Sequence, residues 1–280
     1  MALETISDIA SLRARLAQEN YIAFVPTMGN LHAGHIHLVK LAREKGQCVV
    51  ASIFVNPLQF GANEDLASYP RTLEADCEKL DAAGADIVFT PSASEIYPAE
   101  QTMRISAPPI ANELCGAARP GHFDGVATVV MKLFNIVRPS VAVFGKKDFQ
   151  QLFIIRELVR QFNLPIEIVA GETQREASGL ALSSRNGYLN ASQRLEAQRL
   201  YRTLQLIVEN VQKGNRDYSA IETQSSQYLT QLGWIVDYIS IRSAATLAPA
   251  TPQDSDLVAL AAARQGRTRL IDNIEFSISA

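Results

Sequence analysis

The 280-residue sequence has few cysteines, little net charge and no long apolar run. Its three cysteines, Cys48, Cys77 and Cys115, show no C-x-x-C spacing, so neither a disulfide framework nor a zinc site is indicated. The formal net charge of -3 argues against nonspecific binding to nucleic acid, because such binding usually requires a basic domain. No stretch reaches the roughly 18 uninterrupted apolar residues of a membrane helix, and the polar first segment does not resemble a secretory signal. We therefore expect a soluble, cytoplasmic protein with no nucleic-acid and no membrane partner.

The sequence does contain a regular alternation of apolar strands and amphipathic helices. Helical patterns such as 35–46, where Ile36, Val39 and Ala42 share a face, separate the apolar segments. Strands joined by helices imply a parallel sheet covered on both faces, with ligands at the carboxyl ends of the strands. We predict a doubly wound, Rossmann-like α/β domain over residues 1–174. Its strands are expected at 21–28, 48–55, 86–90, 141–145 and 166–171.

The pattern changes near residue 175. Two long helical patterns, 191–215 and 217–233, are followed by three probable strands within 234–274. This order predicts a smaller C-terminal α+β domain over residues 175–280. The boundary has no linker rich in proline or serine, so we expect a short hinge, with the active site between the domains and the second domain as a lid.

The stretch "PTMGNLHAGH", residues 26–35, follows the first strong strand. Met28 and Gly29 close the strand, and Gly34 and His35 lie in the first turn of the next helix, whose unpaired amides suit an anion such as phosphate. The imidazoles of His32 and His35 could donate hydrogen bonds to phosphate oxygens as charge builds up in a transition state. The alternative is a histidine-rich helix cap with solvent-exposed rings.

Two further polar clusters follow apolar segments. In "FGKKDFQQ", Lys146 and Lys147 could contact phosphates and Asp148 a ribose, although a solvated turn has the same composition. In "GLALSSRNGYL", residues 179–189, two hydroxyls and an arginine could surround a polyphosphate. By itself, this last segment is more typical of a polar surface loop.

Together these clusters resemble the pantothenate synthetase family, the AMP-forming pantoate and β-alanine ligases of the nucleotidylyl transferase superfamily. The resemblance runs nearly end to end and includes "PTMGNLHAGH", "SIFVNPLQFGANEDLASYPRTLEAD", "RPGHFDGVATVV", "FGKKDFQQ", "REASGLALSSRNGYL" and "GRTRLIDNI". The "NPLQF" and "SSRNGYL" stretches distinguish this family from its superfamily relatives.

The resemblance implies a two-step reaction in which ATP converts pantoate to pantoyl adenylate and β-alanine then displaces AMP. It implies catalytic roles for His32, His35 and Lys147, with His35 matching a residue that such families use as a proton donor. We expect His35 to act instead as a neutral hydrogen-bond donor to phosphate, because the helix dipole disfavours a charged ring. Mg²⁺ is expected to be bound mostly by the triphosphate and water, which accounts for the lack of a carboxylate cage in the sequence. The implied ATP-binding residues are Met28, Gly29, Asn30, Leu31, His32, Ala33, Gly34, His35, Gly145, Lys146, Lys147, Asp148, Gln174, Leu182, Ser183, Ser184 and Arg185.

Amide side chains suit the acid substrate, which needs polar groups without another carboxylate. The resemblance assigns Gln59 and Gln151 to the hydroxyl and carboxylate groups of pantoate, and Asn56 adds a third amide. Isolated glutamines are more often surface residues, so these assignments depend on the resemblance. It also implies a homodimer, and it gives no defined role to four matching residues, Tyr69, Arg71, Arg119 and His122.

Three positions depart from the family pattern without removing a chemical requirement. Gln174 stands where a small apolar residue is common, Ser178 where aspartate is common, and Lys146 where an acidic residue is common. Two other functions remain as alternatives, although the amides of "NPLQF" and the presence of His32, His35, Lys147 and Arg185 argue against them. Another adenylyltransferase would need an extra basic site for a phosphorylated substrate, and a non-catalytic nucleotide sensor would not need the full set of charged groups.

Overall fold

The computed structural model describes residues 2–61, 64 and 66–278, and the chain forms two compact units. Unit 1 comprises Met1–Asn112, Arg119–Lys146 and Gln151–Glu172. Unit 2 comprises Glu113–Ala118, Lys147–Gln150 and Thr173–Ala280. Two short segments that precede residue 151, one of which contains Lys147 and Asp148, therefore belong to unit 2.

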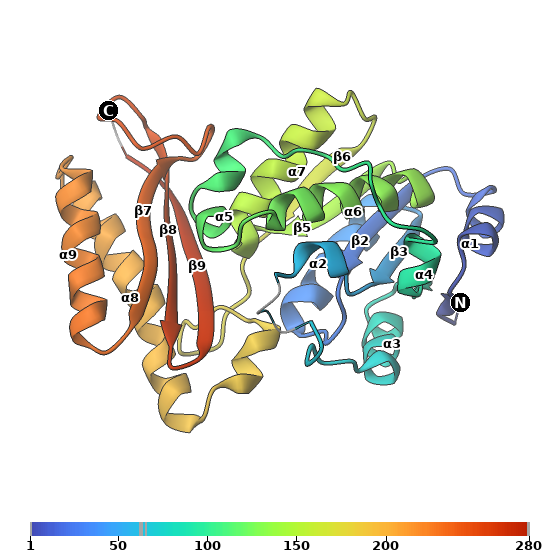
Figure 1. The fold of residues 1–280 in the computed structure, drawn as a ribbon, viewed down its shortest axis with the longest axis horizontal. Coiled ribbons are helices and arrows are strands. Elements are labelled where there is room, and N and C mark those ends of the chain that lie inside the picture. Colours follow the sequence, from blue (N-terminus) through green and yellow to red (C-terminus); the bar gives the residue numbers. More distant parts are fainter. Residues whose placement is uncertain (1, 62–63, 65, 279–280) are drawn as a thin grey trace. The chain divides into compact units, whose positions relative to one another are not determined.

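Unit 1 is built on a six-stranded parallel sheet with the order β1-β4-β3-β2-β5-β6 (Figure 1). The α/β fold class predicted from the sequence is confirmed, and five strands lie where apolar, β-branched segments predicted them. The short first strand lies in a polar stretch and was not predicted. The strands are β1 Glu4–Ile6, β2 Ile22–Thr27, β3 Cys48–Ile53, β4 Ile87–Phe89, β5 Val141–Gly145 and β6 Glu167–Gly171.

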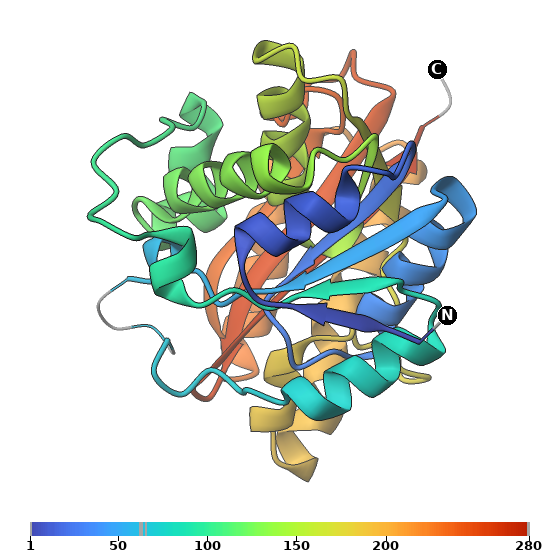
Figure 2. The ribbon, with the colours of Figure 1, turned by 90° about the vertical axis from the view of Figure 1, so that its right-hand side faces the viewer.

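Alternate residues of β2 enter two different cores, one on each face of the sheet. Ile22 and Phe24 pack with α1, α6 and α7, whereas Ala23 and Val25 pack with α2 and α3. Figure 2 shows α1 and α6 on one side of the strands and α3 on the other. Because both faces are covered, the central strands are apolar throughout. The helices are α1 Ile9–Leu16, α2 Ala33–Lys45, α3 Leu73–Ala82, α6 His122–Val137 and α7 Phe149–Gln161, with short helices α4 Ala93–Ile96 and α5 Cys115–Ala118.

At the carboxyl end of β2, the pairing between β2 and β5 has ended while the pairing with β3 continues. β2 pairs with β3 over six residues, but with β5 only through Ala23 and Phe24. Pro26 lies beyond that pairing, and it has no N–H to donate to a ladder on the β5 side. The chain runs from β2 to β3 on one side, while β5 lies on the other. Such a switch point is where open α/β sheets bind ligands.

Unit 2 contains an antiparallel sheet of three strands in the order β7-β8-β9. α8 packs on β8 and β9, and α9 packs on β7, around a core that includes Trp234. α5 and the two residues before it belong to the same unit: the Cys115 Sγ lies 3.1 Å from the Tyr238 hydroxyl, and Glu113 pairs with Arg242 at 2.7 Å. The elements are α8 Ala191–Gln212, α9 Tyr218–Gln231, β7 Ile235–Ser243, β8 Asp256–Gln265 and β9 Thr268–Ser277.

Candidate active site

The turn between β2 and α2 carries the two histidines. Gly29 and Asn30 have positive φ values of 82° and 51°, which reverse the chain at the end of the strand. A Cβ on Gly29 would lie 3.0 Å from the Ile53 side chain and 3.3 Å from the Asp76 carboxylate. Glycine is therefore required both by the conformation and by the space. The turn delivers the chain to His32, which is the N-cap of α2.

Both imidazoles take part in a reciprocal helix cap. The Nδ1 of His32 accepts a hydrogen bond from the Gly34 amide at 3.1 Å, and the Nδ1 of His35 accepts one from the His32 amide at 3.3 Å. A ring nitrogen that accepts from an N–H carries no proton, so each neutral ring has its proton on Nε2. The ring centroids lie 4.1 Å apart. Capping and function are therefore not alternatives here, because capping fixes Nε2–H as the donor of each ring.

Asp76 on α3 holds the backbone of this turn. Its side chain is fully buried, and it accepts hydrogen bonds from the amides of Asn30 at 2.7 Å and Leu31 at 2.8 Å. The Thr72 hydroxyl donates a third bond at 3.0 Å. Charge-assisted bonds of this kind are worth about 1.5 to 3 kcal/mol each. Sequence reasoning did not single out Asp76, although it ends one of the stretches that carry the family resemblance.

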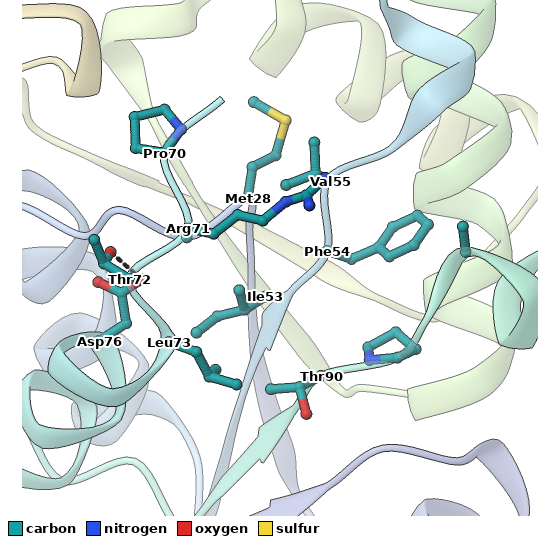
Figure 3. A pocket seen from close by; sticks show the side chains of 13 residues that line it. Met28, Ile53, Phe54, Val55, Pro70, Arg71, Thr72, Leu73, Asp76 and Thr90 are labelled. Carbon is teal, nitrogen blue, oxygen red and sulfur yellow. Dashed lines mark hydrogen bonds between the residues drawn. The ribbon is translucent and has the colours of Figure 1, made fainter. Parts of the chain in front are cut away.

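A cavity of about 300 Å³ opens beside the turn, at the carboxyl ends of β2, β3 and β4 (Figure 3). Met28 and Gly29 form one part of its wall, and Arg71 is its cationic residue. Asp76 also lines it, bonded to Thr72 as the dashed line in Figure 3 shows. The full lining is Met28, Gly29, Ile53, Phe54, Val55, Pro70, Arg71, Thr72, Leu73, Asp76, Thr90, Pro91 and Ala93.

The amides of "NPLQF" lie against the same turn. η1 (Pro57–Gln59) follows Asn56, whose Nδ2 donates to the Gln59 Oε1 and to the Gly125 carbonyl, both at 3.1 Å. The Asn56 Oδ1 accepts from the Tyr97 hydroxyl at 2.8 Å, and burial raises the pKa of that phenol to about 12. Gln59 donates to the Met28 Sδ at 3.2 Å. Asn56 is 1 % exposed and uses its whole amide within the protein, which favours a role in orienting Gln59.

The second predicted ATP segment lies at the end of β5. The Gly145 and Lys146 residues belong to unit 1, where the Lys146 Nζ pairs with Glu172 at 2.6 Å. Lys147 and Asp148 belong to unit 2, with 3.7 Å between the ammonium and the carboxylate. The Lys147 carbonyl accepts a hydrogen bond from the Asn273 side chain at 2.9 Å. The backbone of Lys147 is thereby attached to β9.

The third predicted ATP segment is a short hairpin and turn in unit 2. The Leu182 amide donates to the Gln174 carbonyl at 2.9 Å, and Ser183 caps η4 (Ser184–Tyr188) by accepting from the Arg185 amide. Next to Gln174, Arg175 forms a bidentate pair with Asp272 at 2.6 and 2.9 Å. Burial raises the pKa of Asp272, and Arg175 opposes part of that rise.

The remaining predicted residues have simple positions. Ala33 and Gly34 begin α2, and Gln151 lies half-buried on α7 in unit 1. Among the described residues there is no group of three or more histidine, cysteine, aspartate or glutamate side chains that could hold a metal ion. Over the same part of the chain, no helix combines the length and apolar character of a membrane span.

The fold and the site define a class of protein. The parallel α/β sheet has a helix N-terminus and two imidazoles at its switch point, a place where such sheets commonly bind ligands and where helix N-termini favour anions. The sequence profile of the pantoate-beta-alanine ligase family matches residues 2–275. The chain belongs to that family, so the family and the enzyme class that the motifs indicated, a ligase, are confirmed.

Individual relatives agree with this assignment. The pantothenate synthetase of Methylobacillus flagellatus is 81% identical over 278 residues, which is 99% of this chain and 100% of the relative. The crystal structure of pantothenate synthetase from Thermus thermophilus superposes with a TM-score of 0.92 at 43% identity, covering 97% and 98% of the two chains. A pantoate-beta-alanine ligase from Francisella tularensis, crystallised with beta-gamma ATP and beta-alanine, gives 0.82 at 34% identity, covering 98% and 97%.

Proposed function

We propose that the chain joins pantoate to β-alanine in two steps that consume ATP. The pantoate carboxylate attacks the α-phosphorus, and the bond to pyrophosphate breaks to leave pantoyl adenylate. The amine of β-alanine then attacks the activated carbonyl and loses a proton, and AMP departs with the bonding electrons. The family match over residues 2–275 carries this proposal, and the donor geometry of the histidine turn supports it.

The residues of this turn act by positioning and by stabilising charge, which are the main requirements of phosphoryl chemistry. We assign the Nε2–H groups of His32 and His35, beside the amides at the start of α2, to phosphate oxygens of ATP. Lys147 neutralises charge on the phosphates, and Arg185 does so with Ser183 and Ser184. A neutral donor suits this task because it strengthens its hydrogen bonds as charge develops on the oxygen.

Pantoate requires a pocket with polar groups but without carboxylates. We assign its hydroxyl and carboxylate groups to Gln59 and Gln151, and we assign Asn56 to the orientation of Gln59, as its four bonding positions suggest. Met28 forms the adjacent wall. Asp148 is assigned to the ribose, and Gln174 contacts the nucleotide through its backbone. The other proposed ATP contacts are Gly29, Asn30, Leu31, Ala33, Gly34, Gly145, Lys146 and Leu182.

Mg²⁺ would enter with the triphosphate as part of the substrate, where it would neutralise phosphate charge. This fits the donor set of the turn, which offers N–H groups to anions and no free carboxylate, since Asp76 already accepts three hydrogen bonds.

We also propose that the unit 1 fold is Rossmann-like, because its strands from β4 to β6 follow the order of such sheets. A cytoplasmic homodimer is proposed from the family resemblance.

Pantoate-dependent exchange of labelled pyrophosphate into ATP tests this function. The expected result is exchange with pantoate alone, followed by AMP release only when β-alanine is added. Exchange without pantoate would indicate a different adenylyltransferase. ATP binding without exchange under any acid tested would indicate a nucleotide sensor, and either result would overturn the proposal.

A further inference from the structure

A chain of hydrogen bonds leads from a surface carboxylate to the backbone of Gln59. Glu64 accepts two bonds from the Arg119 guanidinium, at 2.7 and 2.6 Å. Arg119 in turn lies 2.8 Å from the Nε2 of His122, and the Nδ1 of that ring lies 2.8 Å from the Gln59 carbonyl. His122 is 9 % exposed, so this chain is largely shielded from water. All four residues lie in unit 1.

The direction of every bond in this chain is fixed by the arginine. A guanidinium has only donors, so the His122 Nε2 accepts. The single proton of the neutral ring is then on Nδ1, from where it is donated to the Gln59 carbonyl. This tautomer is opposite to that of His32 and His35, whose protons lie on Nε2. The protein therefore uses its histidines in two distinct protonation patterns around one proposed substrate pocket.

Packing against α6 and the bonds from His122 and Arg119 leave the η1 turn little freedom. A Cβ on Gly125, one turn further along α6, would lie 2.2 Å from the Leu58 carbonyl oxygen, so the helix and η1 are already in close contact. The Asn56 Nδ2 donates a hydrogen bond to the Gln59 Oε1 and so holds the Gln59 side chain. The backbone of Gln59 is thus fixed by α6, and its side chain is fixed by Asn56.

We propose that His122 is a positioning residue for pantoate recognition: its Nδ1–H holds the Gln59 carbonyl so that the Gln59 amide faces the substrate. This inference rests on the proposed function and adds a residue to it. His122 touches no reacting atom, and it acts only through Gln59. Arg119 keeps the proton of His122 on Nδ1 and also donates directly to the Gln59 carbonyl at 3.3 Å, and Glu64 acts one step further away by holding Arg119.

Two polar substitutions test separately the two hydrogen bonds of the His122 ring, one to Arg119 and one to the Gln59 carbonyl. In His122→Asn, the amide nitrogen can take the place of Nδ1 and still donate to Gln59, while the contact with Arg119 is lost. In His122→Gln, the amide lies one bond further out, where it can accept from Arg119 but no longer donates at the Nδ1 position. Both variants are smaller than or similar to histidine in volume, and both keep a polar group in the site.

Pyrophosphate exchange measured against pantoate and against ATP provides the test, with Asn135→Leu, at an exposed site near the other end of α6, as the matched control. We expect His122→Gln to raise the KM for pantoate about tenfold, because the Gln59 carbonyl loses the shorter of its two side-chain hydrogen bonds, at 2.8 Å, and keeps only the bond from Arg119 at 3.3 Å. The KM for ATP should change less than about twofold, and His122→Asn should recover most of the pantoate affinity.

Two results would overturn the proposal. Equal effects of the Asn and Gln variants would show that the Nδ1 donor is not the determinant. Equal rises in the KM values for pantoate and ATP would show a general loss of structure, and urea unfolding of each variant would report the same loss directly. Absence of pantoate-dependent exchange in the unsubstituted protein would instead refute the proposed function itself, so the two failures are distinguishable.

Discussion

The buried carboxylate of Asp76 offers the sharpest test of how the histidine turn is built. Replacing it by asparagine keeps the shape but substitutes an NH₂ group for one carboxylate oxygen. The amides of Asn30 and Leu31 bind different oxygens, so one of them must then face another donor inside the protein. The change removes one charge-assisted bond, worth about 1.5 to 3 kcal/mol, and leaves one buried donor unmatched, at about 1 to 3 kcal/mol.

These two losses add up to about 2.5 to 6 kcal/mol if the turn stays in place. Because the turn can shift to relieve the donor contact, we expect the free energy of unfolding to fall by about 2 to 4 kcal/mol in Asp76→Asn. The same shift displaces His32 and His35. An adenylation rate lower by about 10²-fold corresponds to roughly 3 kcal/mol of lost positioning.

Urea unfolding and single-turnover formation of pantoyl adenylate measure the two effects separately. Glu78→Gln is the matched control, because it makes the same chemical change on an exposed residue of the same helix. Its stability should stay within about 0.5 kcal/mol of the unsubstituted protein. If Asp76→Asn behaved like this control in both assays, the carboxylate would not hold the turn and the reasoning would fail.

Three further predictions concern charge. Lys147→Ala should lower the adenylation rate by about 10² to 10³ with unchanged unfolding by urea, and near-normal turnover would remove Lys147 from the phosphate site. His35→Ala should bind ATP within several-fold of normal yet form pantoyl adenylate far more slowly. The rate of the second step, from preformed adenylate and β-alanine, should fall much less. Normal single-turnover adenylation at saturating ATP would contradict this prediction. Burial tends to raise the pKa of Glu64, but the hydrogen bonds and charge of Arg119 outweigh it and lower that pKa below 4.5. The Glu64–Arg119 pair therefore stabilises the fold above about pH 4.5 and loses this contribution as the pH falls further, so Glu64→Gln should flatten the acid side of a stability profile; an unchanged slope would argue against the pair.

Strands and amphipathic helices could be predicted because their periodicity is visible in the sequence. The apolar segments at β2 and β5 and the helical faces of α2 and α8 correspond closely to the observed elements. α6 shows why other elements could not be predicted. It is buried on most sides and largely apolar, so its polar positions outside the core, Asp124, Lys132 and Asn135, form only a narrow stripe that is easily missed in the sequence.

The site could be predicted only where its chemistry is local in the sequence. His32 and His35 lie in one turn, and their spacing indicated a helix N-terminus. Asp76 lies in "EADCEK", which is typical of a solvated helical face, and only the fold brings it to the Leu31 amide. The bond from Asn273 to the Lys147 carbonyl joins residues 126 positions apart, so no local pattern could indicate it.

Because unit 2 is made of three separate segments, its folding during synthesis and the folding of isolated fragments are both restricted. Every segment of unit 1 has been made once the ribosome passes Glu172, so this unit can fold while unit 2 is still incomplete. Cys115 is made 123 residues before its partner Tyr238, and Glu113 must likewise wait for Arg242. A fragment that began near residue 174 would lack both of these early contributions. We therefore expect the C-terminal part, expressed alone, to need the earlier segments supplied in trans before it folds.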